Sequence, residues 1–142
     1  MKILFVCTGN TCRSPMAEAL GMQRGEHTCS SAGIYAQPGS RASLLATQIC
    51  HEHNLSLKEH RARLLNRELL DQAQLVLTMT SQHKDWILEH FGKHPGLYTL
   101  GEYAGVDDIK EVSDPFGGTI SDYHVTLIQL NTLLDAVWRR LQ

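Results

Sequence analysis

The sequence predicts an α/β fold in which a four-stranded parallel sheet carries helices on both faces. Short apolar runs alternate along the chain with longer helical segments, and this alternation is typical of parallel β-α-β units. The first run, 2–6, is almost continuously apolar, as expected for a strand buried on both faces. Near the other end, Leu and Val recur at steps of three and four residues, which indicates an amphipathic helix.

The elements follow from local signals in chain order. Ser14 and Pro15 are suited to the cap and first position of a helix, Asn66 can cap another, and Gly92 can end one. The predicted strands are 2–6, 28–31, 74–79 and 97–100. The predicted helices are 15–24, 40–53, 67–71, 81–91 and a last one that starts near Thr119, after a Gly- and Asp-rich loop. Residues 1–142 are expected to form one domain, a flavodoxin-like three-layer sandwich.

Composition excludes several classes of function. The net charge is −2 and no Lys/Arg block occurs, so no nucleic-acid partner is expected. No apolar run approaches the ~20 residues of a membrane span, and the N-terminal run is too short for a signal peptide. We therefore expect a cytoplasmic protein without a membrane partner. A monomer is favoured, although the sequence leaves the oligomeric state open. Its four cysteines read as thiols. They form no zinc-ligand pairs, so we expect no metal and no cofactor.

The segment 7–14 carries the chemistry, because it joins a strand end, a tight turn and a helix start. Successive backbone N–H groups there can form an anion-binding nest, and the helix N-terminus adds positive potential. Arg13 offers paired donors for two phosphate oxygens. The same field, with a hydrogen bond from Ser14, is expected to lower the pKa of Cys7 and favour a nucleophilic thiolate. The residues expected to bind phosphate or substrate are Thr8, Gly9, Asn10, Thr11, Cys12, Ser14 and Phe116.

A thiolate facing a bound phosphate can attack phosphorus, so the segment predicts a phosphatase that forms a phosphocysteine intermediate. Cleavage also needs an acid for the leaving group and a base for water, and the loop contains no carboxylate. Asp114 is the best candidate, because the following Pro and Gly residues can hold its loop over the pocket. Asp107, Asp108 and Asp122 remain rivals. His83 is expected at a solvated helix position.

These residues resemble the low-molecular-weight protein tyrosine phosphatase family over essentially the whole chain. The matching marks are C-x5-R-S at 7–14, Ser-Ala-Gly at 31–33, the stretch 74–80 and Asp114-Pro115. The resemblance implies Cys7 as nucleophile, Arg13 as clamp and Asp114 as general acid and base. It also implies that Asn10 braces the loop, with Ser14 and with Ser31 and His60 as further partners, and that Cys12 can form a redox-regulating disulfide with Cys7.

Two positions make the chain more similar to the bacterial protein arginine phosphatase branch. Thr11 stands where a branched aliphatic residue is usual, and Phe116 follows Asp-Pro where many tyrosine phosphatases have Tyr. A hydroxyl and a carboxylate can pair with a guanidinium, whereas an aliphatic wall favours a flat ring. We expect phosphoarginine in proteins as the substrate, with phosphotyrosine as the alternative. Arsenate reductase is less favoured, because 74–92 contains no Cys. A module that only binds phosphate would not need Cys7 and Asp114.

Overall fold

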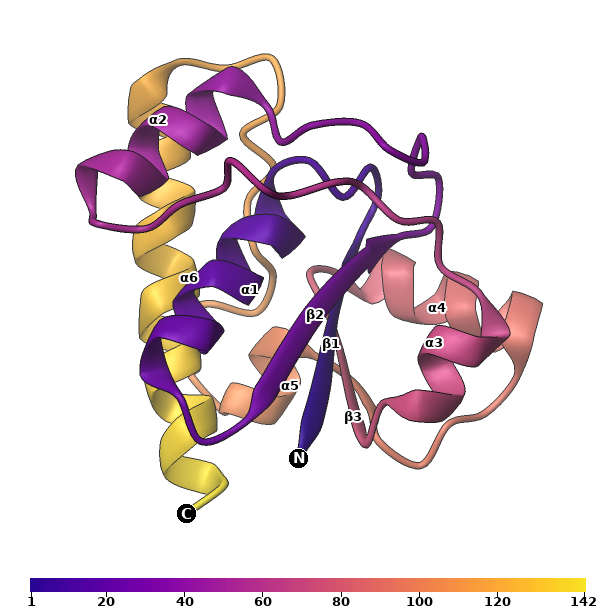
Figure 1. Ribbon diagram of the computed structural model, residues 1–142. Coiled ribbons are helices and arrows are strands. Elements are labelled where there is room, and N and C mark those ends of the chain that lie inside the picture. The colour runs from indigo at the N-terminus through magenta and orange to yellow at the C-terminus, as the bar shows by residue number, and fades with distance from the viewer.

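The computed structural model describes residues 1–142 and confirms the predicted parallel sheet (Figure 1). Its strand order is β2-β1-β3-β4, and all three pairings are parallel. The strands are β1 (Lys2–Cys7), β2 (Thr28–Gly33), β3 (Leu75–Thr78) and β4 (Leu97–Thr99). The helices are α1 (Arg13–Arg24), α2 (Leu44–Glu52), α3 (Arg67–Gln72), α4 (Ser81–Phe91), α5 (Leu100–Ala104) and α6 (Ile120–Arg140).

The central strand β1 explains the three layers. Its residues alternate between two hydrophobic clusters, because successive strand side chains point to opposite faces. Ile3 and Phe5 pack with residues of α1, α2, α5 and α6, whereas Leu4 and Val6 pack with residues of α3 and α4. Figure 1 shows α1 and α6 on one side of the sheet and α3 and α4 on the other. Helices therefore cover both faces, as the apolar run 2–6 predicts.

The sheet places the loop after β1 at the point where the strand order reverses. The chain leaves β1 toward β2 on one side, and the later strand β3 pairs on the other side. In open parallel sheets a crevice forms at this point, outside the carboxyl ends of the strands. The segment 7–14 occupies that position, and both flanking elements are firmly packed.

Two predicted helix starts are wrong, and in both cases the residue that precedes the helix differs from the predicted one. The first helix begins at Arg13 after Cys12, and Ser14 is not its cap. The Ser14 hydroxyl instead contacts the Cys7 sulfur. The helix predicted from residue 40 begins at Leu44, because Ser43 caps it by accepting the N–H of Ala46.

Helix α5 lies in a segment that the sequence analysis treated as strand end and loop. Thr99 accepts the N–H of Glu102, and the Glu102 carboxylate accepts the N–H of Thr99. This reciprocal capping box was present in the sequence as T-x-x-E. Backbone hydrogen bonding by the Glu102 carboxylate, chiefly to Thr99, lowers its pKa.

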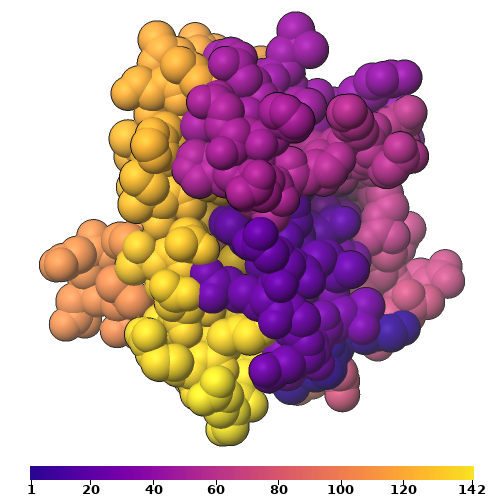
Figure 2. Space-filling view, turned by 60° about the vertical axis from the view of Figure 1, so that its left-hand side comes forward, coloured from indigo at the N-terminus to yellow at the C-terminus, as the bar shows by residue number.

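The first and last helices pack against each other on one face of the molecule. Figure 2 shows α6 beside the N-terminal third of the chain, with the α2 region above. Arg24 at the end of α1 pairs with Asp135 and donates to Asn131, both on α6. No helix combines the length and apolar character that crossing a bilayer requires.

Candidate active site

The loop after β1 folds around Cys7. The backbone N–H groups of Ile34 and Tyr35 donate to the carbonyls of Cys7 and Thr8, at 3.0 and 2.9 Å, so the residues directly after β2 hold the first residues of the loop. The tight turn uses Asn10, whose φ is +58°, rather than the glycine at position 9. Asparagine tolerates this left-handed conformation better than most side chains.

Gly33 brings the end of β2 against the loop. A Cβ atom at this position would lie 2.5 Å from the Thr8 carbonyl oxygen and 2.9 Å from the Asn10 nitrogen. Both neighbours are backbone atoms that cannot swing away. The glycine of the Ser-Ala-Gly segment is therefore required by close backbone approach.

The Cys7 sulfur lies beneath the loop and accepts hydrogen bonds. It is 2.8 Å from the Ser14 hydroxyl oxygen and 3.3 Å from the Asn10 backbone nitrogen, and the residue is 3% exposed. Burial raises the pKa of the Cys7 thiol above its ordinary value. The Ser14 hydrogen bonds, the Arg13 charge and the Asn10 N–H act in the opposite direction.

This result corrects the expectation of a lowered Cys7 pKa. Sequence reasoning counted the helix terminus, the cation and the hydroxyl, but not the desolvation of a sulfur under a closed loop. The thiolate consequently depends on each surrounding donor. We expect the pKa of Cys7 to rise further when one of them is removed.

Asn10 is the centre of the loop's bracing. Its side-chain NH₂ donates to the hydroxyls of Ser14 and Ser31 at 2.8 and 2.9 Å, and its side-chain oxygen accepts the backbone N–H of Arg63 at 2.9 Å. The His60 ring lies 2.7 Å from the Asn10 carbonyl oxygen, with Nε2 as donor. The Asn10 side chain is completely buried. The partners that the resemblance implied, Ser14, Ser31 and His60, are thus all brought to Asn10, whereas Arg63 was not foreseen.

Arg13 is held between two groups at the end of a distant loop. One guanidinium nitrogen donates to the Val112 carbonyl oxygen at 3.2 Å, and another lies 3.5 Å from the Asp114 carboxylate. The Arg13 side chain is 6% exposed and that of Asp114 54%. Among the candidate carboxylates, Asp114 is the one paired with the clamp, while Asp122 is engaged in capping α6. The geometry therefore favours Asp114 over its rivals.

His83 is a neighbour of the loop that sequence reasoning placed in solvent. It is 4% exposed, and its Nε2 lies 2.9 Å from the Thr8 hydroxyl. Its Nδ1 accepts the backbone N–H of Thr80, so in the neutral ring Nε2 carries the hydrogen and donates to Thr8. Burial, aided by the Arg13 charge, lowers the pKa of His83 to about 4. The available signal was its position three residues after Thr80, where it completes a capping box.

Thr11 and Cys12 continue the loop on its other side. Thr11 is partly exposed, and its carbonyl oxygen accepts the Ser43 N–H at 3.0 Å. The Cys12 sulfur is buried, 3.5 Å from the Ser43 hydroxyl and 3.4 Å from the Tyr123 hydroxyl. Burial, together with the Cys12 hydrogen bond, raises the pKa of Tyr123. Cys7 and Cys12 are both free thiols, so a disulfide between them stays a prediction.

The rim of the site carries an exposed aromatic ring. Phe116 is 76% exposed, and its backbone N–H donates to the Asp114 carboxylate at 3.1 Å. This short-range bond fixes the turn that presents both side chains. The structure thus places Phe116 beside the predicted acid, with its ring free to meet a substrate.

The remaining cysteines have no part in the site. Cys29 and Cys50 are buried, and burial raises the pKa of each thiol to about 12. Unlike Cys7, neither sulfur accepts a hydrogen bond or faces an arginine, so both stay protonated near neutral pH. No three or more His, Cys, Asp or Glu side chains are grouped in a way that could hold a metal ion.

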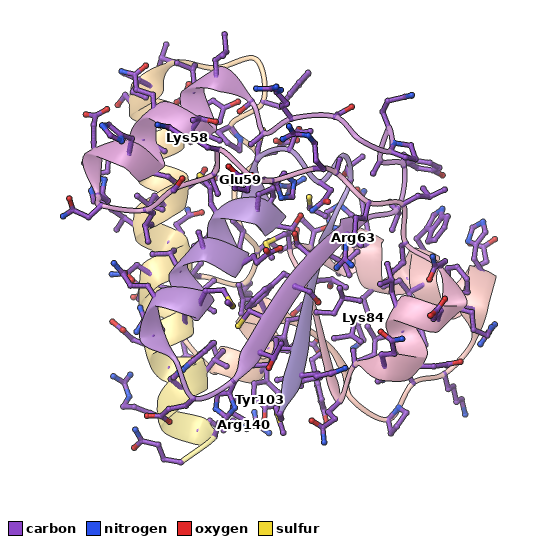
Figure 3. All side chains as sticks on the ribbon, in the orientation of Figure 1. Lys58, Glu59, Arg63, Lys84, Tyr103 and Arg140 are labelled. Carbon is purple, nitrogen blue, oxygen red and sulfur yellow. The ribbon has the colours of Figure 1, made fainter.

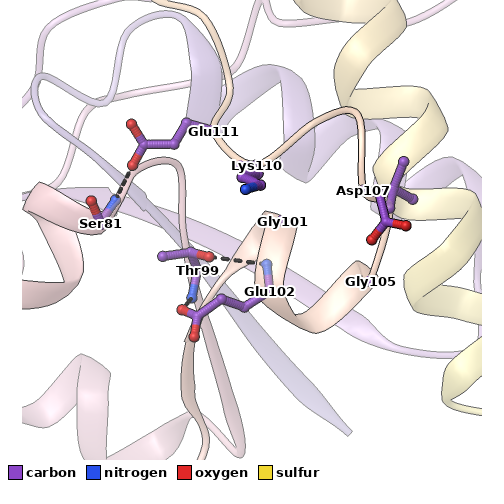
Figure 4. Close-up of a pocket in the computed structure, with 9 residues that line it drawn as sticks. Ser81, Thr99, Gly101, Glu102, Gly105, Asp107, Lys110 and Glu111 are labelled. Carbon is purple, nitrogen blue, oxygen red and sulfur yellow. Dashed lines mark hydrogen bonds between the residues drawn. The ribbon is translucent and has the colours of Figure 1, made fainter.

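A separate hollow of about 700 Å³ lies beside α5 (Figure 4). It is lined by residues around Thr99–Asp107 and by Ser81, Lys110 and Glu111, and no residue of the loop 7–14 lines it. The Glu111 carboxylate accepts the Ser81 N–H at 2.6 Å, and this bond lowers the pKa of Glu111. The bond joins Glu111, the residue before Val112, to the start of α4. This wall of the hollow therefore supports the Val112 carbonyl that accepts from Arg13.

Comparisons with known proteins agree with this geometry. Residues 2–142 match the family described as low molecular weight phosphotyrosine protein phosphatase. The chain is 42% identical over 144 residues to a protein-arginine-phosphatase of Geobacillus stearothermophilus, covering 99% of this chain and 96% of that one. It is 41% identical over 148 residues to the Bacillus subtilis protein-arginine-phosphatase, covering 100% and 97%. It is 38% identical over 138 residues to the low molecular weight protein-tyrosine-phosphatase PtpB of Staphylococcus epidermidis, covering 96% of each chain.

Solved structures give the same picture. The YwlE arginine phosphatase from Geobacillus stearothermophilus superposes with a TM-score of 0.92 at 42% identity, covering 99% of this chain and 92% of that one. A YwlE arginine phosphatase with a phosphorylated active-site serine, a C7S mutant, also gives 0.92 at 40% identity, covering 99% and 95%. In that protein the side chain replacing the cysteine carries the phosphoryl group.

Proposed function

Because the chain belongs to the low molecular weight phosphotyrosine protein phosphatase family, we propose that it removes phosphate from phosphoarginine residues of proteins. The relatives described above are all named as phosphatases, and one of them is a C7S mutant with a phosphorylated active-site serine. The observation that carries the arginine assignment is the polar rim of the loop. Thr11 and Asp114 offer a hydroxyl and a carboxylate where a guanidinium would lie, and Phe116 offers a flat apolar surface.

The reaction begins with the Cys7 thiolate attacking phosphorus in line with the leaving nitrogen. Arg13 and the loop's N–H groups bind the phosphoryl oxygens, whose negative charge they offset in the transition state. Asp114 donates a proton to the leaving guanidinium nitrogen as the P–N bond breaks. The product of this step is a phosphocysteine on Cys7 and a released arginine side chain.

Hydrolysis then restores the enzyme. A water molecule attacks phosphorus, Asp114 accepts its proton, and the S–P bond breaks to release phosphate and the Cys7 thiolate. Ser14 donates a hydrogen bond to the sulfur and stabilises it as a leaving group. The sequence supplies all of these groups, so the reaction needs no cofactor.

A protein tyrosine phosphatase is the second candidate, favoured by the 38% identity to PtpB. The discriminating experiment compares kcat/KM on phosphoarginine and phosphotyrosine peptides of the same sequence. Thr11→Val replaces the hydroxyl by a methyl group at almost constant shape, and Thr11→Ser keeps the hydroxyl as a matched control. We expect the wild type to prefer phosphoarginine, with the preference reduced in Thr11→Val and Thr11→Ile but retained in Thr11→Ser.

A wild-type preference for phosphotyrosine would overturn the arginine assignment. An unchanged ratio in Thr11→Val and Thr11→Ile would show that Thr11 does not set specificity. Action in the cytoplasm remains part of the proposal. It is supported by four cysteines that are all free thiols.

A further inference from the structure

A continuous chain of hydrogen bonds runs from the Cys7 sulfur to a carboxylate on the far side of the loop. The Cys7 sulfur lies 2.8 Å from the Ser14 oxygen, which lies 2.8 Å from the Asn10 side-chain nitrogen. The same nitrogen lies 2.9 Å from the Ser31 oxygen, and the Ser31 oxygen lies 2.6 Å from the Glu18 carboxylate. Glu18 is on α1, one turn beyond Ser14. The two ends of the chain are thus joined through three buried polar side chains.

The direction of these bonds follows from counting hydrogens. Each serine hydroxyl has one hydrogen to donate, and the amide group of Asn10 has two. Because Asn10 donates to Ser14, the Ser14 hydrogen is free for the Cys7 sulfur. Because Asn10 also donates to Ser31, the Ser31 hydrogen goes to Glu18. The sulfur is therefore an acceptor, as a thiolate requires.

The opposite arrangement would remove this donor from the sulfur. If the Asn10 amide were flipped, its oxygen would accept the hydrogens of both serines, and Ser14 would no longer donate to Cys7. Two groups outside the amide oppose the flip. The Arg63 N–H requires an oxygen on one side of the amide. The Glu18 carboxylate, which only accepts, requires the hydrogen of Ser31 on the other side.

We propose that Glu18 is a positioning residue of the phosphatase: by accepting the Ser31 hydrogen, it keeps the Asn10 amide oriented so that the Ser14 hydroxyl donates to the Cys7 sulfur. The inference rests on the proposed role of Cys7 as nucleophile. Its effect on the sulfur is nevertheless measurable without a phosphorylated substrate. Charge-assisted hydrogen bonds such as the one to Glu18 are among the stronger ones, which suits a residue that fixes a direction.

Glu18 can be substituted without opening the core. It is half-buried and lines a groove of about 490 Å³ between α1 and residues 54–60, together with Glu59. Figure 3 labels Glu59 near α1 and Arg63 near the carboxyl end of β2. Alanine is the best helix former, so Glu18→Ala suits the middle of α1. Glu59 lines the same groove, is exposed and has no side-chain hydrogen bond, which makes Glu59→Ala a matched control.

The test measures the rate at which iodoacetamide alkylates Cys7 as a function of pH, with the site of alkylation read by mass spectrometry. The midpoint reports the pKa of the thiol, and the rate at high pH reports access to the sulfur. In Glu18→Ala we expect the midpoint to rise by between about half a pH unit and one pH unit. This shift corresponds to the partial loss of one hydrogen bond to a charged group. The high-pH rate should stay at the wild-type value. Glu18→Gln, whose oxygen can accept the same hydrogen, and Glu59→Ala should both keep the wild-type midpoint.

The sign of the shift separates this role from simple electrostatics. Removing a negative charge near a thiolate lowers its pKa, so a purely electrostatic Glu18 would give lower midpoints in both Glu18→Ala and Glu18→Gln. Lower midpoints in both variants would overturn the proposal. So would an unchanged midpoint in Glu18→Ala, or a reduced alkylation rate at high pH in Glu18→Ala. Ser31→Ala breaks the same connection from its other end and should also raise the midpoint. In the Ser31→Ala background, Glu18→Ala should add no further shift.

The alkylation readout also keeps this proposal apart from the proposed function. If the protein hydrolysed neither phosphoarginine nor phosphotyrosine peptides, the function would fail. The midpoint of Cys7 alkylation would still respond to Glu18 as described. If hydrolysis were normal but the midpoint did not move, only the role of Glu18 would fail.

Discussion

Replacing Asn10 by alanine tests the hydrogen-bond network at its centre. The substitution removes the side-chain bonds to Ser14, Ser31 and the Arg63 N–H. The bonds to Ser14 and Ser31 are buried and the bond to the Arg63 N–H is partly buried, so water does not readily replace them. The substitution also places alanine at a φ of +58°, a conformation that asparagine tolerates better.

The expected loss of stability follows from these contacts. Three hydrogen bonds at about 1 kcal/mol each give about 3 kcal/mol, and the left-handed backbone adds about 1 kcal/mol. The sum of about 4 kcal/mol is a large part of the stability of an ordinary domain. Asn10→Gly loses the same bonds without the backbone strain, so it should cost about 1 kcal/mol less than Asn10→Ala.

Urea unfolding measures both effects, because the midpoint falls in proportion to the lost free energy when the slope is unchanged. Asn66→Ala is the matched control. Asn66 caps α3 by accepting the Leu69 N–H, and its side chain bonds no residue of the loop 7–14, so its loss should cost about 1 kcal/mol and leave activity unchanged. If Asn10→Ala lost no more stability than Asn66→Ala, the network would not hold the loop as described. Equal stability of Asn10→Ala and Asn10→Gly would contradict the assigned backbone strain.

Further predictions concern the loop's packing and its histidine. Gly33→Ala forces the backbone at Thr8 and Asn10 to shift. We expect kcat/KM on para-nitrophenyl phosphate to fall by about tenfold to a hundredfold, and unaltered kinetics would contradict the close approach. Because the pKa of His83 is lowered from 6.5 to about 4, the unfolded chain binds its proton first as the pH falls, and the stabilisation present above pH 6.5 is lost toward pH 4. The free energy of unfolding from urea titrations should therefore fall between about pH 7 and pH 5, by about 2 kcal/mol more in the wild type than in His83→Gln. An equal fall in both proteins would remove His83 as the cause.

The sequence could predict what lies within one contiguous stretch. The apolar run 2–6 and the helix signals after residue 12 placed Cys7 and Arg13 in one strand-to-helix junction, as found. Helix α4 was predicted with its observed bounds, because Ser81 begins a run closed by Gly92 with φ of +83°. Signals of this kind act over a few residues, so no tertiary information is needed to read them.

The contacts that the residue pattern alone could not supply join segments far apart in the chain. The Asn10 side chain meets Ser31, 21 residues away, and the Arg63 backbone, 53 residues away. His83 reaches Thr8 across 75 residues. Such pairings are set by how β1, β2 and β3 pack, and a single sequence does not contain the register of that packing. The resemblance supplied Ser31 and His60, but it did not supply Glu18, Arg63 or His83.

The wrong expectation for the pKa of Cys7 has the same origin. The donors around the sulfur are adjacent in sequence and could be counted. The desolvation that opposes them arises from the burial of Cys7 in the folded chain, which only the folded structure reveals.

The central claim is that phosphorus is transferred to the Cys7 sulfur. The most direct measurement mixes the wild-type protein with a phosphoarginine peptide, quenches within one turnover and locates the phosphoryl group by mass spectrometry. We predict that it lies on Cys7, because the sulfur takes phosphorus from the substrate before water attacks, and that Cys7→Ala shows no turnover. A phosphoryl group on another residue, or turnover that persists in Cys7→Ala, would contradict the account.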